Sequence, residues 1–349
     1  MIELIGGLLL LIIGAELSVR AAVGLAAILQ TRPLFLGLTV VALGSSAPQM
    51  AVGLQAAFSS SSDIAIGSVV GSNIFNVLVT LGLAALIIPL RVARQLVRVD
   101  IPLMIGATAL VAALSWNGVL SGLDGAILLL VLGGYLVIVL RQSAHGTHCL
   151  IIADRPKRKV RPLIAQLAMM IGGLALMIYG SHFLVSAATV IAQDLGLSER
   201  VIGLTVIGIA TSLPGLMTSL IAALRGERDI AVGNVIGSNL FNLLGVLGAT
   251  ALISPQPLSI SPNALDFDLP VMLATAALTL PLFYSGYRIT RLEGLLLLAL
   301  YVVYGLHIVS FTTGMPLADQ LESLMLHYVL PVLALGIAFT TVRAWRRQH

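Results

Sequence analysis

Apolar stretches long enough to cross a lipid bilayer follow one another along almost the whole of this 349-residue chain. A transmembrane helix needs about 20 consecutive, mainly apolar residues. Hydrophobic residues make up 58% of the sequence and charged residues 10%, whereas a soluble domain carries about 25% charged residues. The sequence therefore predicts an all-α polytopic membrane protein whose structure is adapted to the bilayer.

Eleven membrane spans account for the apolar stretches. The first starts at the N-terminus without a basic region or a small-residue cleavage site, so we expect a retained helix rather than a signal peptide. The single cysteine, Cys149, excludes an internal disulfide framework. The predicted spans cover residues 4–29, 33–58, 63–90, 100–115, 122–141, 162–192, 200–224, 229–253, 268–286, 290–312 and 325–342.

Basic residues gather in alternate loops of this topology, with 17 of the 19 on one side. The positive-inside rule makes that side cytoplasmic. We therefore expect an integral protein of a bacterial inner (plasma) membrane, with its N-terminus outside and its C-terminus cytoplasmic. The 17 residues are Arg32, Arg91, Arg94, Arg98, Arg141, Arg155, Lys157, Arg158, Lys159, Arg161, Arg225, Arg228, Arg288, Arg291, Arg343, Arg346 and Arg347.

This distribution explains the net charge of +4 without nucleic-acid binding. The basic loop 142–161 is interpreted as a topology determinant that also contacts anionic membrane lipid. His145, His148 and Cys149 lie in the same loop, but three such residues without a fourth at the usual spacing favour an ordinary loop over a metal site.

The chain resembles itself at an offset of 166 residues. Residues 36–82 and 202–248 align without a gap and share 22 identities in 47 positions. Each copy contains five spans, and an odd number makes the second copy enter the membrane from the opposite face. Inverted repeats with interrupted helices are typical of secondary transporters, whose site lies between the repeats near the membrane midplane.

The repeat divides the chain into four parts. Residues 1–141 form the first inverted repeat, with its repeated motif at 36–82, and residues 142–161 form the basic cytoplasmic loop. Residues 162–312 form the second inverted repeat, with the matching motif at 202–248. Residues 313–349 add an eleventh helix and a basic tail that have no counterpart in the first repeat.

Two spans carry a proline in their middle. Residues 44–49 read Gly-Ser-Ser-Ala-Pro-Gln and residues 210–215 read Ala-Thr-Ser-Leu-Pro-Gly. Proline lacks an amide donor and clashes with the preceding turn, so carbonyl groups are freed at membrane depth. This is tolerated where the backbone is packed in protein or lines a polar cavity.

Polar pairs follow these breaks in the next span of each copy. Ser72 and Asn76 lie four residues apart on one helical face, as do Ser238 and Asn242. Small polar residues also allow helices to pack closely, which is our interpretation of the neighbouring glycines. For the hydroxyls beside the prolines and for the paired asparagines, their repetition in both copies favours an ion pathway.

These segments resemble the two alpha repeats of the cation/calcium exchanger superfamily, which includes the sodium/calcium exchangers. The resemblance covers the chain up to about residue 312, and the family pattern is G-T-S-x-P-E followed by G-N-x-x-G-S-N-x-F-N. It implies ten core helices, with the second, third, seventh and eighth around the ions and the first and sixth sliding across them. Carried over by position, the implied ion-lining residues are Ser45, Ser46, Gln49, Ser72, Asn76, Thr211, Ser212, Gly215, Ser238 and Asn242.

The sequence departs from the family at the glutamate that follows each proline. Gln49 stands in one of these positions and Gly215 in the other. Calcium takes six to eight oxygen ligands and normally includes carboxylates among them. Without them a divalent cation would be uncompensated in a low-dielectric site. Glu16, the acidic residue nearest the middle of a span, is a possible surrogate ligand, although an ion pair with Arg20 is the ordinary interpretation.

The leading hypothesis is a secondary-active cation antiporter of the sodium/calcium exchanger type, working by alternating access, with altered substrate selectivity. It needs no cofactor beyond its transported ions, Na⁺ and Ca²⁺ or another cation. A neutral cage of oxygen ligands suits Na⁺ better than Ca²⁺. One alternative is an anion or neutral-solute transporter on the same fold, and another is a transport-inactive pseudo-exchanger acting as scaffold or sensor. No enzyme motif is legible in the sequence.

Overall fold

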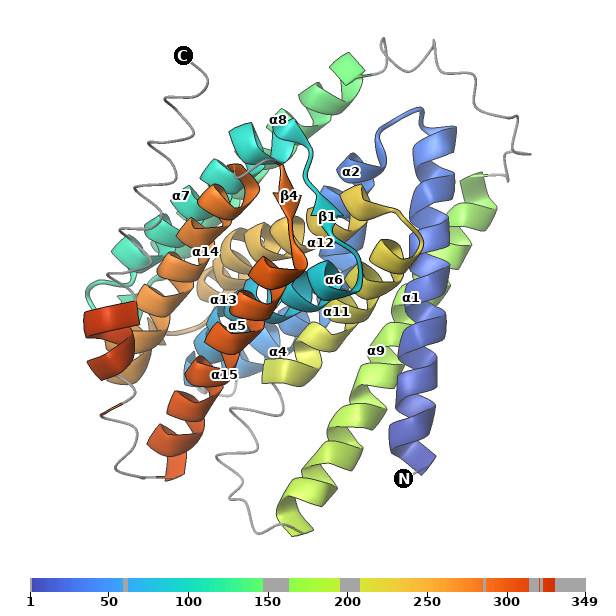
Figure 1. The fold of residues 1–349 in the computed structure, drawn as a ribbon. Coiled ribbons are helices and arrows are strands. Elements are labelled where there is room, and N and C mark those ends of the chain that lie inside the picture. Colours follow the sequence, from blue (N-terminus) through green and yellow to red (C-terminus); the bar gives the residue numbers. More distant parts are fainter. Residues whose placement is uncertain are drawn as a thin grey trace.

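The computed structural model describes residues 2–58, 62–146, 163–194, 208–284, 287–313, 320 and 323–329, and these are almost entirely helical (Figure 1). The first repeat consists of α1 (Ile2–Ile28), α2 (Pro33–Leu36), η1 (Gly37–Val41), α3 (Ala42–Ser45), α4 (Ala47–Phe58), α5 (Ser62–Phe75), η2 (Asn76–Thr80), α6 (Leu81–Ile87), η3 (Leu96–Asp100), α7 (Ile101–Leu114) and α8 (Gly122–Gly146).

The second repeat follows the same order. It consists of α9 (Leu163–Asp194), α11 (Gly208–Leu224), α12 (Arg228–Leu240), η6 (Phe241–Val246), α13 (Leu247–Ile253), η7 (Ala264–Asp268), α14 (Leu269–Tyr284) and α15 (Arg291–Thr313), and η8 (Met325–Val329) comes after it. The η elements are single π-helical turns. The described residues also include four two-residue strands: β1 (Leu90–Arg91), β2 (Val119–Leu120), β3 (Leu258–Ser259) and β4 (Arg288–Ile289).

Eight helical spans in the described part of the chain are long and apolar enough to cross a membrane. A ninth consists of two helices, Pro33–Ser45 and Ala47–Phe58, that meet at a 42° bend. The described part of α11 is an apolar helix that is shorter than a full span. These helices confirm the prediction of an all-α polytopic membrane protein. Most of the predicted eleventh span and of the basic loop 142–161 lies outside the described residues.

The inversion of the two repeats is visible where α1 crosses α9, at one side of the molecule (Figure 1). A Cβ atom placed on Gly7 would lie 2.8 Å from the carbonyl oxygen of Gly180, and one on Gly14 would lie 2.6 Å from that of Gly173. The contact therefore moves forward along α1 and backward along α9. Since Gly7 and Gly173 occupy equivalent positions of the repeat, the two contacts are related by a pseudo-twofold axis.

Other helices and strands also pair across the two repeats, in equivalent positions. Gly82 of α6 lies against Gly294 of α15, while the equivalent Gly248 of α13 lies against Gly125 of α8. Strand β1 pairs with β4 and strand β2 with β3, in both cases antiparallel and across the repeats. Each repeat thus supplies helices and strand edges that complete the other, and the two cannot be separated as independent domains.

The glycine crossing of α1 and α9 offers a matched test. Replacing Gly173 by leucine should push the helices apart, because its Cβ would lie 2.7 Å from the Gly14 carbonyl oxygen. Overpacking of this kind costs about 1–3 kcal/mol, which a thermal melt in detergent would measure. Gly172→Leu is the control, since nothing lies within 4 Å of a Cβ there. Equal melting temperatures for the two variants would contradict the crossing.

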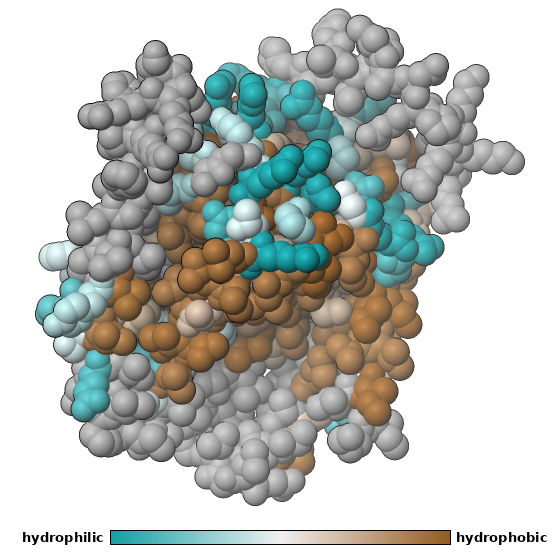
Figure 2. Space-filling view, viewed as in Figure 1, coloured by the Kyte–Doolittle hydropathy of each residue, from teal (hydrophilic) through white to brown (hydrophobic). Residues whose placement is uncertain are grey.

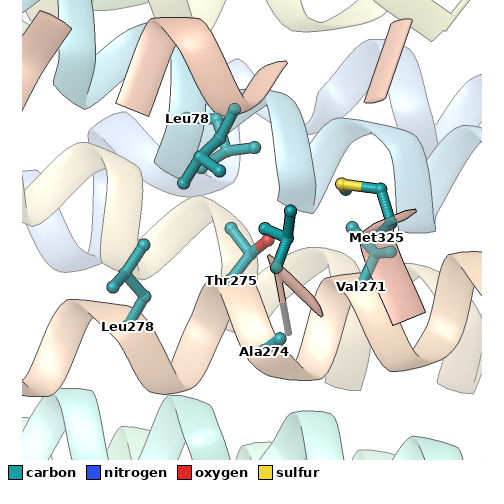
Figure 3. Close-up of a pocket in the computed structure, with 8 residues that line it drawn as sticks. Leu78, Val271, Ala274, Thr275, Leu278 and Met325 are labelled. Atoms are coloured by element: carbon teal, nitrogen blue, oxygen red, sulfur yellow. The ribbon is translucent and has the colours of Figure 1, made fainter. Parts of the chain in front are cut away.

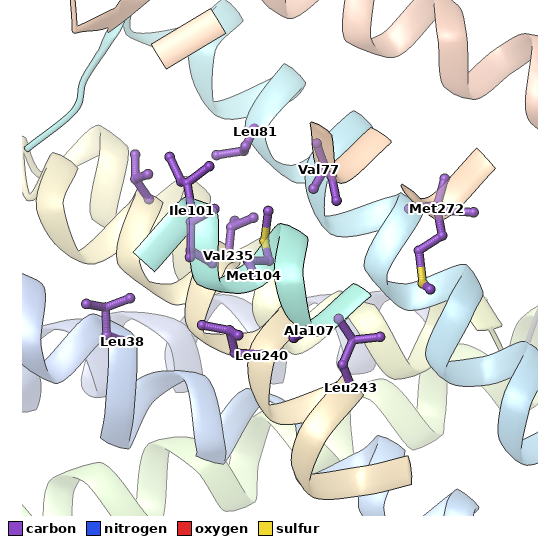
Figure 4. Packing of buried hydrophobic residues seen from close by; sticks show 14 of the residues in the cluster. Leu38, Val77, Leu81, Ile101, Met104, Ala107, Val235, Leu240, Leu243 and Met272 are labelled. Atoms are coloured by element: carbon purple, nitrogen blue, oxygen red, sulfur yellow. The ribbon is translucent and has the colours of Figure 1, made fainter. Parts of the chain in front are cut away.

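Helix α12 lies at the centre of the protein, and every residue from Ile230 to Gly248, across α12, η6 and the start of α13, is buried. Leu38 of η1, Val235 and Leu240 of α12 and Met104 of α7 pack together beside it (Figure 4). On the outside, a band of apolar residues crosses the face of the molecule below a hydrophilic region (Figure 2). An apolar band on the outside and buried polar groups inside are the arrangement expected of a bilayer protein.

Candidate functional site

The two prolines of the motif affect their helices differently. Helix α3 ends at Ser45, Ser46 takes φ −88° and ψ −1°, and α4 starts at Ala47, so the backbone bends ahead of Pro48. Pro214, in contrast, lies inside the continuous helix α11. Its missing amide frees the carbonyl of Ala210, which instead accepts a 2.6 Å hydrogen bond from the Ser181 hydroxyl of α9. The expected interruption is therefore a real break in the first repeat alone.

The Ser45 hydroxyl connects the break to the second repeat. Its Oγ lies 2.8 Å from Oγ of Ser238 and 3.0 Å from Oδ1 of Asn234, both on α12. All three side chains are at most 4% exposed. Residues almost 200 positions apart in the sequence thus form one buried polar cluster where α3 meets α12.

Asn234 holds helix α11 in this cluster. Its Nδ2 donates to the carbonyl oxygen of Gly215 at 3.0 Å and to the hydroxyl of Ser219 at 2.9 Å. A Cβ atom on Gly215 would lie 3.7 Å from Oγ of Ser45. Gly215 therefore faces the cluster, and the space beside it accepts a side chain without a backbone clash.

Gln49 of the first repeat also forms a hydrogen bond with the second repeat. From α4, its Nε2 donates to the Thr211 carbonyl at 2.8 Å and lies 3.4 Å from the Ser72 hydroxyl of α5. Because a backbone carbonyl can only accept, the amide nitrogen must face Thr211, and this fixes the orientation of the side chain. The other amide atom, Oε1, is buried without a hydrogen-bond partner. Thr211 and Gly215 lie one turn apart on α11, so Gln49 and Gly215 belong to the same cluster.

Asn76 and Asn242 lie one helical turn after Ser72 and Ser238, where α5 is followed by the π-helical turn η2 and α12 by η6. Asn76 opens η2, and its Nδ2 donates to Oδ1 of Asn239 at 3.0 Å. Asn239 in turn lies 3.4 Å from the Asn73 carbonyl. Asn242, in η6, is fully buried, and neither of its amide atoms has a hydrogen-bond partner. Single π-helical turns often occur at functional positions.

The predicted site residues are therefore all internal. Hydrogen bonds bring Ser45, Gln49, Ser72 and Ser238 together with the backbone of Thr211 and Gly215. Ser46 and Ser212 are also buried, at 4% and 2% exposed.

Asn234 and Ser219 were not predicted as site residues, yet they organise the second-repeat half of the cluster. Asn234 could have been found from its spacing, because it precedes Ser238 by four residues on the same helical face.

The Glu16 carboxylate forms ion pairs with two arginines. Its carboxylate accepts from Arg20 at 2.5 Å, which confirms the predicted ion pair, and from Nε of Arg225 at 2.6 Å. A further contact joins it to Nη2 of Arg225. Both carboxylate oxygens are engaged by these arginines, which leaves the structure without support for Glu16 as a surrogate ion ligand.

The hydrogen-bonded cluster contains hydroxyl, amide and carbonyl groups and no charged side chain. Among the described residues, no group of three His, Cys, Asp or Glu side chains could hold a metal ion. A small cavity near η8 is lined by Leu78, Val271, Thr275, Met325 and neighbouring apolar residues (Figure 3). That cavity offers one hydroxyl and so does not resemble an ion site.

Two inverted five-helix repeats that enclose a buried polar cluster define the class of inverted-repeat membrane transporters. The family model described as sodium/calcium exchanger protein matches residues 1–141 and 165–310, and the chain belongs to this family.

Relatives extend over most of the chain. CaxA of Alkalimonas amylolytica is 38% identical over 85% of this chain and 95% of its own length. The sodium/calcium exchanger MaX1 of Methanosarcina acetivorans is 29% identical over 85% of this chain and 95% of its own. A solved structure of the sodium-calcium exchanger NCX_Mj superposes with a TM-score of 0.73 and 30% identity, covering 86% of this chain and 96% of that one.

Proposed function

We propose that this protein is a secondary-active cation antiporter that works by alternating access and carries a monovalent cation such as Na⁺ in preference to Ca²⁺. Family membership, and the relatives MaX1 and NCX_Mj that are named as sodium/calcium exchangers, support cation antiport. The observation that supports the change of selectivity is the uncharged polar cluster around Gln49 and Gly215.

The hydrogen bonds of the cluster favour a cation over an anion. The amide nitrogens of Gln49 and Asn234 face carbonyl and hydroxyl oxygens of the protein. Their hydrogens are thereby used, while Oε1 of Gln49 has no partner. Oxygen acceptors remain available at the centre, and acceptors are the groups that coordinate hard cations. An anion at this point would require free donors, which the amide nitrogens of Gln49 and Asn234 do not provide.

The charge of the cluster favours a monovalent cation. A divalent ion loses a large hydration energy on entering a low-dielectric site, and neutral ligands alone recover less of it than carboxylates do. Calcium sites accordingly include carboxylates, and this cluster contains none. Neutral oxygens compensate a single charge better than a double one, so Na⁺ is the expected substrate.

We also propose, from the distribution of basic residues, that the protein lies in a bacterial inner membrane with its N-terminus outside and its C-terminus in the cytoplasm. Its partners are then inorganic cations and membrane lipid, and its transport needs no cofactor. The part of the chain that carries the transport function is the ten-helix core, residues 1–312.

Exchange in proteoliposomes tests the function. Vesicles loaded with Na⁺ should take up radioactive Na⁺ from outside, and external Na⁺, Li⁺ or K⁺ should compete while micromolar Ca²⁺ should not. Empty vesicles are the control. Uptake of an anion or neutral solute without cation dependence would establish the first alternative, and absence of flux for every cation would favour the pseudo-exchanger.

A further inference from the structure

A buried carboxyl group without a hydrogen-bond partner lies where η3 meets α7, outside the polar cluster. Asp100 is 0% exposed, and neither of its side-chain oxygens has a partner. An aspartate at the start of a helix commonly caps it, but Asp100 makes no capping hydrogen bond to α7. A structural role as a helix cap therefore does not explain this residue.

Tyr135 of α8 faces Asp100. The two groups interact electrostatically, and the tyrosine is 1% exposed. The tyrosine hydroxyl nevertheless does not reach hydrogen-bond geometry with the carboxylate or with any other described group. Three buried oxygen atoms of one pair are thus left without a hydrogen bond, and each such atom calls for an explanation.

The second repeat contains the same pair with its hydrogen bonds complete. Asp268 of η7 and Tyr304 of α15 are the counterparts of Asp100 and Tyr135. Asp268 accepts from the Tyr304 hydroxyl at 3.1 Å and from Nδ2 of Asn263 at 3.2 Å. Two donors therefore stabilise a carboxylate at this position of the second repeat.

The first repeat uses the equivalent amide for a different contact. Gln95 stands in the position of Asn263, but its Nε2 donates to Oε1 of Gln142 on α8 at 2.6 Å. Asp100 consequently lacks the donor that completes the second pair. An ionised carboxylate without donors or a counter-charge is strongly unfavourable in a buried position, and such a group becomes neutral instead.

The basic groups at this end of the molecule do not neutralise Asp100. None of the described arginines donates to it. Arg94 and Arg98 are exposed, and Arg94 lies over the Tyr287 ring, 5.7 Å from its centroid. Among the titratable and charged side chains of the neighbouring elements, Tyr135 is the group that acts on Asp100. The described ones at this end are Tyr135 and Arg141 of α8, Tyr284 of α14, Arg228 and Asp229 of α12, Arg91 of β1 and Arg288 of β4.

A small cavity lies at the same end of the molecule. Val139, one turn after Tyr135 on α8, lines it together with Gln95, Gln142 and the exposed Arg32. The proposed topology places this end in the cytoplasm. Tyr135 is thus one helical turn away from a cavity with polar groups in its wall.

The other direction along α7 leads to the asparagines of the polar site. Met104 lies one turn after Asp100, and its sulfur is 3.6 Å from Nδ2 of Asn239. Asn239 in turn accepts from Asn76. A movement of α7 at Asp100 therefore reaches the asparagine pair through one side chain.

We propose that Asp100 is a proton-binding site, whose carboxyl carries a proton in the packing described here and releases it when water enters from the cytoplasmic end. The ionised carboxylate draws water toward Tyr135 and displaces α7 against Asn239, so Na⁺ transport depends on cytoplasmic pH through this residue. The inference rests on the proposed cation transport and adds a site for a second ligand, the proton, outside the polar cluster.

The melting temperature as a function of pH tests the site. An unfolded chain near neutral pH holds its aspartates ionised, so folding with a protonated Asp100 takes up one proton. The folding equilibrium constant should therefore fall about tenfold for each unit of increase in pH. Asp100→Asn keeps a neutral side chain of the same size at every pH and should remove this component. Asp100→Leu should remove it too, which preserves the test if one variant does not fold.

Asp268→Asn is the matched control. It should keep the pH dependence that Asp100 causes but lower the melting temperature, because the Asp268 carboxylate loses an acceptor for two hydrogen bonds. A second measurement is the infrared difference spectrum of the unmodified protein and Asp100→Asn at neutral pH, which should contain the carbonyl band of a protonated carboxyl group. The rate of Na⁺ exchange should vary with pH in the unmodified protein and stay level in Asp100→Asn.

Equal pH profiles of the unmodified protein and Asp100→Asn, or absence of the carbonyl band, would overturn the proton site. A rise in melting temperature caused by Na⁺ or K⁺ at alkaline pH that Asp100→Asn abolishes would also overturn it, because a metal cation would then occupy the pair. Absence of Na⁺ exchange in an unmodified protein that keeps the pH-dependent melting would refute the proposed function and leave the proton site standing.

Discussion

Replacing Gln49 and Gly215 together by glutamate is expected to raise the affinity for Ca²⁺ by about 100-fold, equivalent to ~2.7 kcal/mol. The two positions belong to one buried cluster, and they are the places where the family pattern has its carboxylates. Each added carboxylate supplies a negative ligand of the kind that calcium sites normally contain. The position of Gly215 accepts a side chain, because the nearest atoms to a Cβ there are 3.7 Å away.

Titration calorimetry with CaCl₂ measures this effect. The double variant Gln49→Ala with Gly215→Ala controls for the change of volume and backbone and should not gain Ca²⁺ affinity. Gln49→Glu alone should show an intermediate gain. Micromolar Ca²⁺ binding by the unmodified protein would refute the reasoning from charge compensation, and with it the expected preference for a monovalent ion.

Replacing Asn234 by leucine, a side chain of similar size, is expected to destabilise the protein by about 2–5 kcal/mol. The change removes the hydrogen bonds to the Gly215 carbonyl and the Ser219 hydroxyl and the acceptor facing Ser45. Groups left unpaired in a buried position pay the full cost of lost solvation. The melting temperature in detergent should fall accordingly, even without Na⁺.

The control for the Asn234→Leu variant is a substitution at Ser68, the equivalent position of the first repeat. Ser68 occupies the equivalent position but makes no hydrogen bond, so Ser68→Ala should leave the melting temperature in Na⁺-free buffer nearly unchanged. Similar losses of stability in the two variants would show that the second repeat is not the more tightly bonded half of the cluster. Comparing the two variants therefore tests whether the side chain at position 234 stabilises the protein through hydrogen bonds that the equivalent position 68 lacks.

Much of the fold followed from the sequence because bilayer proteins obey strong local constraints. Each apolar span must form a helix to satisfy its own backbone, and an odd number of helices in each repeat forces the inversion. The contacts of Gly7 with Gly180 and of Gly14 with Gly173 have the antiparallel direction that this inversion requires. The ion pair of Glu16 with Arg20 was also predictable, because the two residues are one helical turn apart.

The consequences of the two prolines were less predictable. Both sit in equivalent motifs, yet the helix breaks before Pro48 and continues through Pro214. The difference lies in the surroundings, since Ser181 of α9 satisfies the carbonyl that Pro214 frees. Ser181 and Ala210 lie on different helices, so no local sequence pattern predicts their hydrogen bond. The interaction of Glu16 with Arg225 was not predicted for the same reason.

The sequence by itself determined the membrane-spanning helices, the two inverted repeats and the loss of both motif carboxylates, because each of these is recorded in spacing and residue type along the chain. The tertiary structure decided which polar groups are paired and which remain open. Ser45 meets Ser238 across 193 residues, and Gln49 meets the Thr211 carbonyl across 162. A hydrogen bond depends on the distance between two atoms to within a few tenths of an ångström, and the packing of helices from both repeats sets that distance.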